Sequence, residues 1–232
     1  MATTFKTITA NDVTNTRTLL HEAIPLTGTI ASGTYNDDNI KEFSHGMFQS
    51  VYDYPYLSSS ANHIFDVTHG YSSVSGFSGS TSLQNAKKIN IYNQMASVLV
   101  GHDATGSIQR FDQDGNIAAG GAKLNEAFFL NFSRLLSKDE IKKDTFRLSF
   151  LTGGTPDART DTLTIGDYGA STSYLANSPA GEYAVLYTSS ATPNADSGVG
   201  LLYYQAGVAV LTSSIFDGDM GPGFSSGTYS AL

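Results

Sequence analysis

The chain has 232 residues with a net charge of −8, no cysteine and only 15% charged residues. The lack of cysteine excludes disulfide bonds and cysteine-ligated metal centres, and the acidic balance argues against a general nucleic-acid-binding protein. No apolar run approaches the ~20 residues of a membrane-spanning helix, and low charge with many Ser, Thr, Gly and Tyr residues favours β structure with frequent turns over a helical bundle.

Two helices are predicted in the first half of the chain, one of them at residues 13–22. The clearest covers residues 83–100, where the apolar residues form one stripe, made of Leu83, Ala86, Ile89, Tyr92, Met95, Ala96 and Leu99. Ser80 or Ser82 can cap its start, and Gly101 stands where a glycine commonly ends a helix. This pattern predicts a helix that packs one face against the rest of the domain.

A further short helix is predicted at about residues 138–143. Ser137 and Glu140 have the spacing of a capping box, in which each side chain bonds a free backbone N–H of the other residue. The capping spacing therefore places a helix start at Ser137.

Strands are predicted mainly in the second half of the chain. Asp114 and Gly115 suit a tight hairpin turn between strands at residues 107–111 and 116–119, because glycine tolerates positive φ. In the first half, residues 62–68 alternate as a strand, with Ile64 and Asp66 on one face and the other face formed by His63, Phe65, Val67 and His69. The remaining strands are expected at residues 127–133, 145–151, 160–165, 183–188, 199–204 and 208–213, with a turn at 205–207.

These elements predict an α+β, β-dominated fold: an antiparallel β sheet or sandwich with one main helix at about residues 83–100 and a short helix at about 138–143. Residues 1–12 are expected to form an N-terminal arm, residues 13–216 a single β-rich domain with inserted loops, and residues 217–232 a flexible Gly/Ser tail. Both ends are expected to be mobile in the free subunit and ordered by neighbours. No basic segment followed by an apolar one opens the chain, so no secretion signal is expected.

Two segments match part of a functional motif. Asp112 and Asp114 resemble part of an EF-hand loop, but Arg110 and Gly121 then stand at the first and last loop positions, where oxygen ligands are required. A plain turn is therefore favoured, with a weak cation site as the alternative. Residues 223–227 read GFSSG, the letters of the hydrolase nucleophile elbow, but no acidic residue or histidine follows them, so a Gly/Ser tail explains them.

Titratable residues form no recognisable catalytic arrangement. The histidines match no short metal-binding motif; they are His21, His45, His63, His69 and His102. Solvated helix faces explain the two lysine pairs, Lys87-Lys88 and Lys142-Lys143. No catalytic residue, cofactor or metal site is predicted, although a carboxylate pair among the 21 acidic residues stays open because it can be recognised only from geometry.

Clusters of tyrosine are the most unusual feature. Tyr52, Tyr54 and Tyr56 lie within five residues, and Tyr203 and Tyr204 adjoin each other in a predicted strand. Tyrosine combines an apolar ring with a polar tip and is enriched at interfaces. These five tyrosines are the candidates for a subunit interface. Ordinary half-buried tyrosines are the equal alternative, and carbohydrate stacking is a third.

Four segments together resemble a family of uncharacterised virion structural proteins of large contractile-tailed bacteriophages. They read FSHGMFQSVYDYPY at 43–56, SSANHIFDVT at 59–68, IYNQMA at 91–96 and SIQRFD at 107–112. The resemblance extends over about residues 10–215 and includes no catalytic signature. It implies a particle component of the neck, tail or baseplate, and it carries over no set of functional residues.

The function expected from this resemblance is that of a non-enzymatic structural subunit, assembled in the host cytoplasm and located in the virion. Its expected partners are copies of itself and other virion proteins, with no sequence-specific nucleic-acid binding and no membrane span. The acidic, cysteine-free composition agrees with assembly in a reducing cytoplasm. The alternatives are a receptor- or glycan-binding β module on a virion or cell surface and a hydrolase of envelope polysaccharide.

Overall fold

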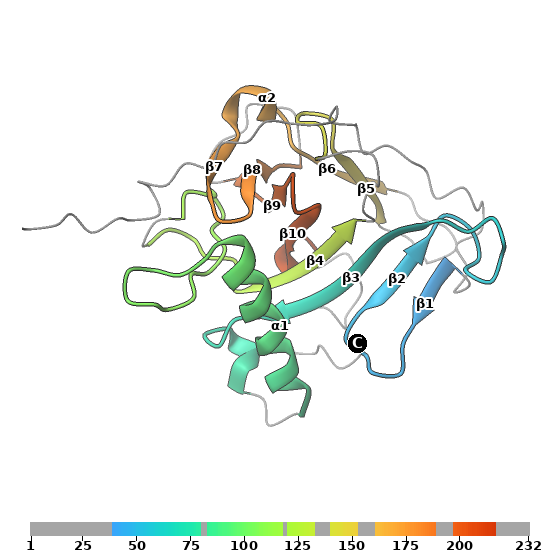
Figure 1. Cartoon of the computed structure of the whole chain (residues 1–232), viewed down its shortest axis with the longest axis horizontal. Coiled ribbons are helices and arrows are strands. Elements are labelled where there is room, and N and C mark those ends of the chain that lie inside the picture. Colours follow the sequence, from blue (N-terminus) through green and yellow to red (C-terminus); the bar gives the residue numbers. More distant parts are fainter. Residues whose placement is uncertain are drawn as a thin grey trace, which may run out of the picture.

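The computed structural model describes residues 39–79, 83–117, 120–132, 140–152, 161–188 and 197–216. Its largest element is an eight-stranded sheet in which all neighbouring strands are antiparallel (Figure 1). In spatial order the strands are β1 (Ile40–Glu42), β2 (Gln49–Tyr52), β3 (His63–Tyr71), β4 (Glu126–Phe132), β10 (Val208–Thr212), β9 (Gly200–Tyr203), β8 (Gly181–Leu186) and β7 (Leu175–Ser178). The predicted β-dominated α+β class is confirmed.

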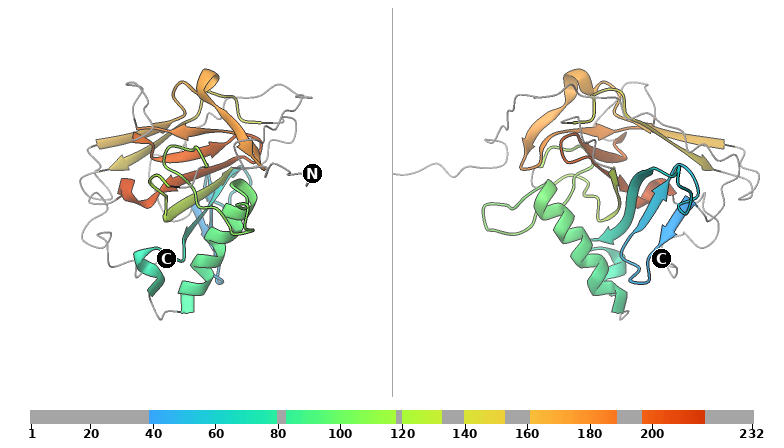
Figure 2. Two further views of the ribbon diagram at one scale, coloured as in Figure 1. Left: turned by 90° about the vertical axis from the view of Figure 1, so that its left-hand side faces the viewer. Right: turned by 45° about the vertical axis from the view of Figure 1, so that its right-hand side comes forward.

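A two-stranded hairpin covers one face of this sheet. It consists of β5 (Arg147–Thr152) and β6 (Asp161–Gly166), which pair with each other in antiparallel fashion. Gly166 also pairs with Tyr187, just beyond β8, through two backbone hydrogen bonds of 2.9 Å. Phe146 and other apolar residues fill the space between the hairpin and the sheet, and Figure 2 shows the hairpin lying over the β8–β9–β10 region.

Buried side chains of the central strands alternate between two cores. Leu201 and Tyr203 face the main helix, α1 (Leu83–Leu99), and the loop that follows it, whereas Leu202 and Tyr204 face the hairpin. β8 and β10 follow the same alternation. Because both faces are covered, these strands are continuous apolar runs in the sequence and lack the alternation of apolar and polar residues seen in a half-exposed sheet.

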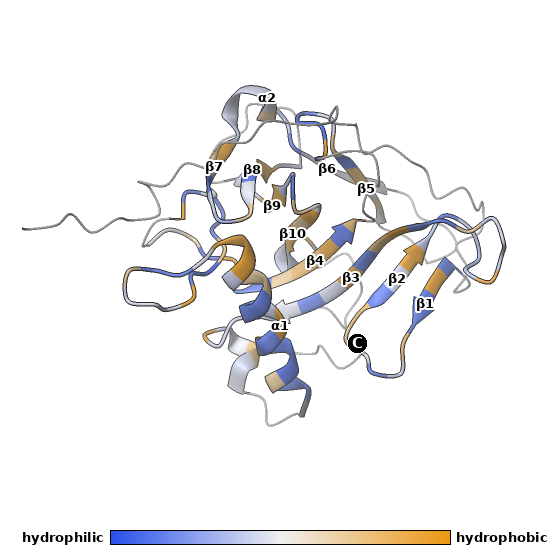
Figure 3. Cartoon of the chain, viewed as in Figure 1, coloured by the Kyte–Doolittle hydropathy of each residue, from blue (hydrophilic) through white to orange (hydrophobic). Residues whose placement is uncertain are grey.

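The main helix, α1 (Leu83–Leu99), covers the other face of the sheet. It ends as predicted: Gly101 has φ +93° and donates a backbone hydrogen bond of 2.9 Å to the carbonyl of Ala96. Tyr92 and Ala96 are buried, but Ala86 in the first half is exposed. The predicted apolar stripe is therefore confirmed for the second half of the helix, where apolar residues gather (Figure 3), and is wrong at Ala86.

The short helix lies elsewhere than predicted. Residues 140–143 are not helical, because the backbone N–H of Ile141 donates instead to the carbonyl of Tyr204 at 3.2 Å. Pairing with the end of β9 thus overrides the local capping pattern. The short helix of the structure is α2 (Ala170–Ser173), which begins at Gly169 with φ +76°.

The turn predicted at Asp114 and Gly115 is confirmed, but the strand predicted before it is wrong. Gly115 has φ +74°, and its N–H donates to the carbonyl of Asp112 at 3.2 Å. The preceding residues 107–111 form no strand and pair only at an isolated bridge of Ile108. Their backbone bonds to the loop that follows α1 and not to a neighbouring strand, since the N–H of Gln109 donates to the carbonyl of Gly101 at 3.0 Å. Residues 116–117 of the following predicted strand form no strand either, and residues 118–119 lie outside the described residues.

β3 is longer than the predicted strand and contains an irregularity at its start. The pairing register between β2 and β3 shifts between Val51 and Tyr52. The shift lets the imidazole Nε2 of His63 lie 2.8 Å from Oδ1 of Asp66, although simple alternation placed these side chains on opposite faces. The prediction of the strand is confirmed, and its assignment of His63 to a face is corrected.

The other predicted strands correspond to β4, β5, β6, β8, β9 and β10, and Gly207, with φ +66°, lies in the predicted turn. β1, β2 and β7, which have three or four residues each, are not predicted; unlike the equally short β9, they are not continuous runs of buried residues. The helix predicted at residues 13–22, the arm at 1–12, the tail at 217–232 and the GFSSG segment at 223–227 lie outside the described residues.

Candidate functional site

The tyrosine-rich loop between β2 and β3 is closed at its base by polar side chains. Asp53 accepts hydrogen bonds from the backbone N–H of Asn62 at 2.6 Å and from its Nδ2 at 2.8 Å. These bonds from Asn62 hold the pKa of Asp53 below its ordinary value. Asn39 donates from Nδ2 to the carbonyls of Tyr52 and Asp53, each at 3.2 Å. The two ends of the loop are thereby tied together.

The tip of this loop presents apolar side chains to solvent. Leu57 is 87% exposed and Tyr54 is 43% exposed. Two consecutive turns order the backbone, since Ser58 N donates to the carbonyl of Pro55 at 2.8 Å and Ala61 N donates to that of Ser58 at 3.1 Å. The loop lies at the end of the β2–β3 hairpin, away from α1 (Figure 1). It is therefore an ordered apolar projection, which we call the Tyr54–Leu57 tip.

The other two tyrosines of the loop are partly buried. The ring of Tyr52 lies 6.3 Å from that of Tyr56 and 5.4 Å from that of His63, measured between centroids. Tyr52 and Tyr56 are both half-buried and support the loop from within. Of the three predicted interface tyrosines in this segment, Tyr54 offers the largest fraction of its surface to a partner.

Tyr203 and Tyr204 are buried inside the subunit, so their prediction as interface residues is corrected. They occupy a central strand whose two faces are both covered, a location that the local sequence does not reveal. The ring of Tyr203 stacks on that of Tyr183 at 5.1 Å. Tyr204 points into the opposite core, where its hydroxyl donates to Asp167 at 2.8 Å.

Asp167 is a fully buried carboxylate whose oxygens accept several hydrogen bonds. Besides Tyr204, the donors are the backbone N–H groups of Asp144 at 2.7 Å and Phe146 at 2.9 Å, and Nη1 of Arg147 at 3.0 Å. Burial raises the pKa of Asp167, whereas the hydrogen bonds favour its charged form. Because Asp167 connects the hairpin layer to β9 and has no exposed surface, its environment is that of a structural anchor.

A second polar network joins Glu140, Lys143, Glu182 and Gln205. The ammonium of Lys143 lies 3.2 Å from Glu140 and 2.5 Å from Glu182, and Nε2 of Gln205 donates to both carboxylates at 2.7 and 3.2 Å. Although burial opposes it, the two carboxylates raise the pKa of Lys143. The structure thus brings together a carboxylate pair that sequence spacing could not identify, and both members interact with the same ammonium and the same amide.

The acidic turn at residues 112–116 has its cation supplied by another residue of the same chain, Lys123. Lys123 forms an ion pair with the buried Asp112, and Asp114 accepts hydrogen bonds from Asn116. Burial raises the pKa of Asp112 against the opposing effect of Lys123. In the described ranges no group of three or more His, Asp or Glu side chains could hold a metal ion. The turn interpretation therefore accounts for this segment.

Among the residues that the structure describes, no helix is long and apolar enough to cross a membrane. The fold defines a two-layered β structure with one covering helix, and the networks around Asp167 and Gln205 connect parts of the fold to one another. Comparison with models of protein families, with curated proteins and with solved structures finds no match for this chain.

Proposed function

We propose that this chain is a non-enzymatic structural subunit of a tailed-phage virion, in the neck, tail or baseplate region, that works through protein–protein contacts. The proposal begins from the resemblance of residues 43–56, 59–68, 91–96 and 107–112 to virion structural proteins. Its partners are other virion proteins and further copies of the chain.

The observation that carries the proposal is the Tyr54–Leu57 tip. Burying a leucine side chain contributes roughly 2 kcal/mol, and Leu57 is almost fully exposed in the subunit. Because hydrogen bonds already order the loop, a partner would lose little conformational entropy on binding it. Tyrosine is enriched among the residues that contribute most to binding at interfaces, and the neighbouring Leu57 adds apolar surface that a partner would bury.

The buried polar groups favour the same proposal. Asp167 and Glu140 are engaged by donors from the chain itself, and they hold layers of the fold together. A rigid subunit suits assembly, because interfaces between preorganised partners form with little change of the backbone.

Purified particles test the proposal directly. Quantitative mass spectrometry of virions is expected to find the chain at a defined copy number per particle, retained through density-gradient purification. Leu57→Ser is expected to reduce incorporation, whereas Val98→Ser, which alters an exposed residue on α1, is expected to leave it unchanged. Absence of the chain from purified particles overturns the proposal.

A glycan-binding module remains the second candidate because Tyr54 exposes part of its ring on an ordered loop. Binding to a glycan array that is lost in Tyr54→Ala and kept in Val98→Ser would favour this function. Incorporation into particles without any glycan binding would favour the structural role.

A further inference from the structure

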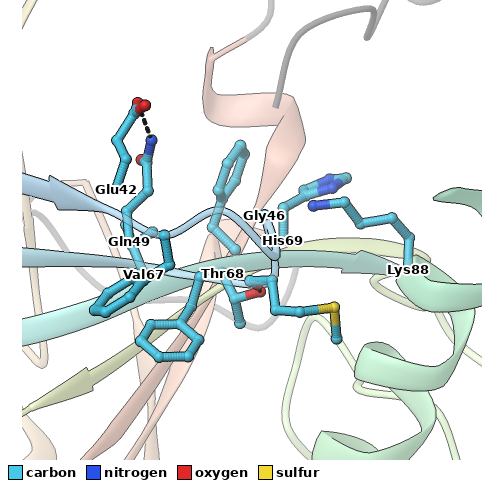
Figure 4. A pocket seen from close by; sticks show the side chains of 11 residues that line it. Glu42, Gly46, Gln49, Val67, Thr68, His69 and Lys88 are labelled. Carbon is cyan, nitrogen blue, oxygen red and sulfur yellow. Dashed lines mark hydrogen bonds between the residues drawn. The ribbon is translucent and has the colours of Figure 1, made fainter.

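A hollow of about 500 Å³ lies at the opposite end of β2 from the Tyr54–Leu57 tip (Figure 4). We call it the β3 pocket, because it borders the edge of β3 at residues 67–69. Its volume falls in the range of about 300–1,000 Å³ that is typical of small-molecule sites. Its walls come from the β1–β2 loop, from β3 and β4, and from α1.

The pocket forms because β2 is shorter than β3. Gln49, the first residue of β2, pairs with Val67, so β3 continues beyond the point where β2 begins. The β1–β2 loop turns at Gly46, which has φ +61° and donates to the carbonyl of Phe43 at 2.9 Å. The loop is then fixed over β3, since Thr68 Oγ1 donates to the carbonyl of Met47 at 2.5 Å. A hollow remains between the loop and the part of β3 that continues beyond β2.

Close packing of α1 on β3 places a cation at this hollow. A Cβ atom on Gly70 would lie 2.9 Å from the carbonyl oxygen of Lys88 and 2.8 Å from the backbone nitrogen of Tyr92. Only a glycine permits this approach of helix to strand. Lys88 therefore starts from a backbone held against β3, and its side chain extends towards His69 along the pocket (Figure 4).

The pocket walls are mostly apolar, and one end carries the charge of Lys88. The aromatic walls include Phe43, Phe48 and Phe128, and the rings of Phe43 and Phe48 lie 4.8 Å apart. Lys88 forms no ion pair with any carboxylate of the described residues. Glu42 also lines the pocket, but it accepts a hydrogen bond of 2.9 Å from Gln49 at the far end (Figure 4).

The electrostatics of this end of the pocket follow from burial. Burial lowers the pKa of Lys88, and burial together with the nearby Lys88 lowers the pKa of His69 to about 4. The imidazole is therefore neutral near pH 7 and adds no second charge. An ammonium beside apolar walls is poorly hydrated, and an anion placed against it would stabilise its charged form.

We propose that the β3 pocket binds a small amphipathic organic anion, with an apolar ring or short chain against the phenylalanines and a single carboxylate or sulfonate paired with Lys88. The charge and the apolar walls are both required, because the body of the ligand supplies buried apolar area and the anion supplies orientation. The proposal is independent of the virion role, since the pocket and the Tyr54–Leu57 tip lie at opposite ends of β2.

Two fluorescent probes of matched shape test the proposal on the full chain. Anilinonaphthalene sulfonate carries the ring system and an anion, and N-phenylnaphthylamine carries the ring system alone. The anionic probe is expected to bind at one site per chain and about tenfold or more tighter than the neutral probe. Octanoate and phenylacetate are expected to displace it, whereas octanol is expected to displace it much less.

Variants of two adjacent lysines assign the binding to the pocket. Lys88→Met keeps an unbranched side chain but removes the charge, so affinity for the anionic probe is expected to fall about tenfold while affinity for the neutral probe changes little. Lys87→Met, at an exposed position outside the pocket, is expected to change neither affinity. Phe48→Ser is expected to weaken binding of both probes.

Circular dichroism of each variant checks that the fold is retained. Equal affinity of the two probes for the wild-type chain overturns the proposal, as does an unchanged affinity of folded Lys88→Met for the anionic probe. Loss of binding in Lys87→Met to the same extent as in Lys88→Met would also overturn it, because the charge effect would then be general and not local to the pocket.

Discussion

The hydroxyl of Tyr204 donates a hydrogen bond of 2.8 Å to Oδ2 of Asp167, a residue 37 positions earlier in the chain. The neighbouring Tyr203 is equally buried on the other face of the sheet, but its hydroxyl has no hydrogen-bond partner in the part of the chain that the structure describes. Two adjacent tyrosines therefore differ in what their hydroxyl groups contribute to stability.

Removing the hydroxyl should destabilise the protein at Tyr204 but not at Tyr203. Tyr204→Phe deprives a buried carboxylate of one donor and is expected to lower the free energy of unfolding by about 1–3 kcal/mol. Tyr203→Phe removes a buried hydroxyl that gains no hydrogen bond, and it is expected to be neutral or to stabilise by about 1 kcal/mol. Urea denaturation of both variants measures the difference. Equal destabilisation by the two substitutions would contradict this assignment.

Gly70→Ala should destabilise the contact between α1 and β3. The added Cβ atom would collide with backbone atoms of the helix, which cannot rotate away as a side chain can. The expected loss is about 1–3 kcal/mol in the free energy of unfolding. Gly76→Ala is the control, because nothing lies within 4 Å of its added Cβ atom. A thermal melt that ranks the two variants equally would contradict the inferred close approach.

Stability should depend on pH through His69. The pKa of His69 is about 4 in the folded chain, whereas an ordinary histidine, as in the unfolded chain, has a pKa of 6.5. The unfolded chain therefore binds the proton first as the pH falls. Its stabilising contribution is complete above pH 6.5 and is lost as the pH falls to about 4. The loss over this window is roughly 3 kcal/mol, from about 1.4 kcal/mol for each pH unit.

A pair of histidine variants isolates this contribution. The difference in unfolding free energy between the wild-type chain and His69→Gln is expected to shrink or reverse as the pH is lowered from 6.5 to 4. His102→Gln, at an exposed position, is expected to run parallel to the wild-type chain. Chemical denaturation at several pH values measures both. Parallel curves for His69→Gln and the wild-type chain would refute the role of His69.

Lys143→Met should destabilise the network around Gln205. The substitution leaves Glu140 and Glu182 close together without their shared cation, at an expected cost of about 1–3 kcal/mol. Lys142→Met is the matched control, because the side chain of Lys142 is exposed. The two midpoints of urea denaturation should therefore differ. If they coincide, the network contributes nothing measurable to stability.

Local patterns in the sequence predict the elements whose residues interact mainly with their near neighbours. The helix end at Gly101 depends on an αL glycine and bonds within one turn, and the turn at Gly115 depends on positive φ. Both are visible in a short window of sequence. The capping pattern at residues 137–140 is equally local, but pairing of Ile141 with Tyr204 decides against a helix at 140–143.

The candidate interface tyrosines also show which features local sequence can predict and which depend on the tertiary fold. The sequence identifies both Tyr54 and Tyr203 as members of tyrosine clusters. It cannot tell that Tyr54 is exposed and Tyr203 buried, because exposure depends on which elements pack over each residue in the fold. β9 becomes central because β10 and β8 pair on its two sides, and both partners are chosen by register and topology. Burial on both faces then removes Tyr203 and Tyr204 from any outer surface.

By itself the sequence determined the β-rich class, the main helix and the positions of its glycine turns, because backbone geometry and apolar spacing act over a few residues. Only the tertiary structure decided that Asp167 meets Tyr204 and that Lys88 reaches the pocket beside His69. Those encounters depend on strand register and on the depth at which α1 packs against Gly70, which are properties of chain segments that are distant in sequence.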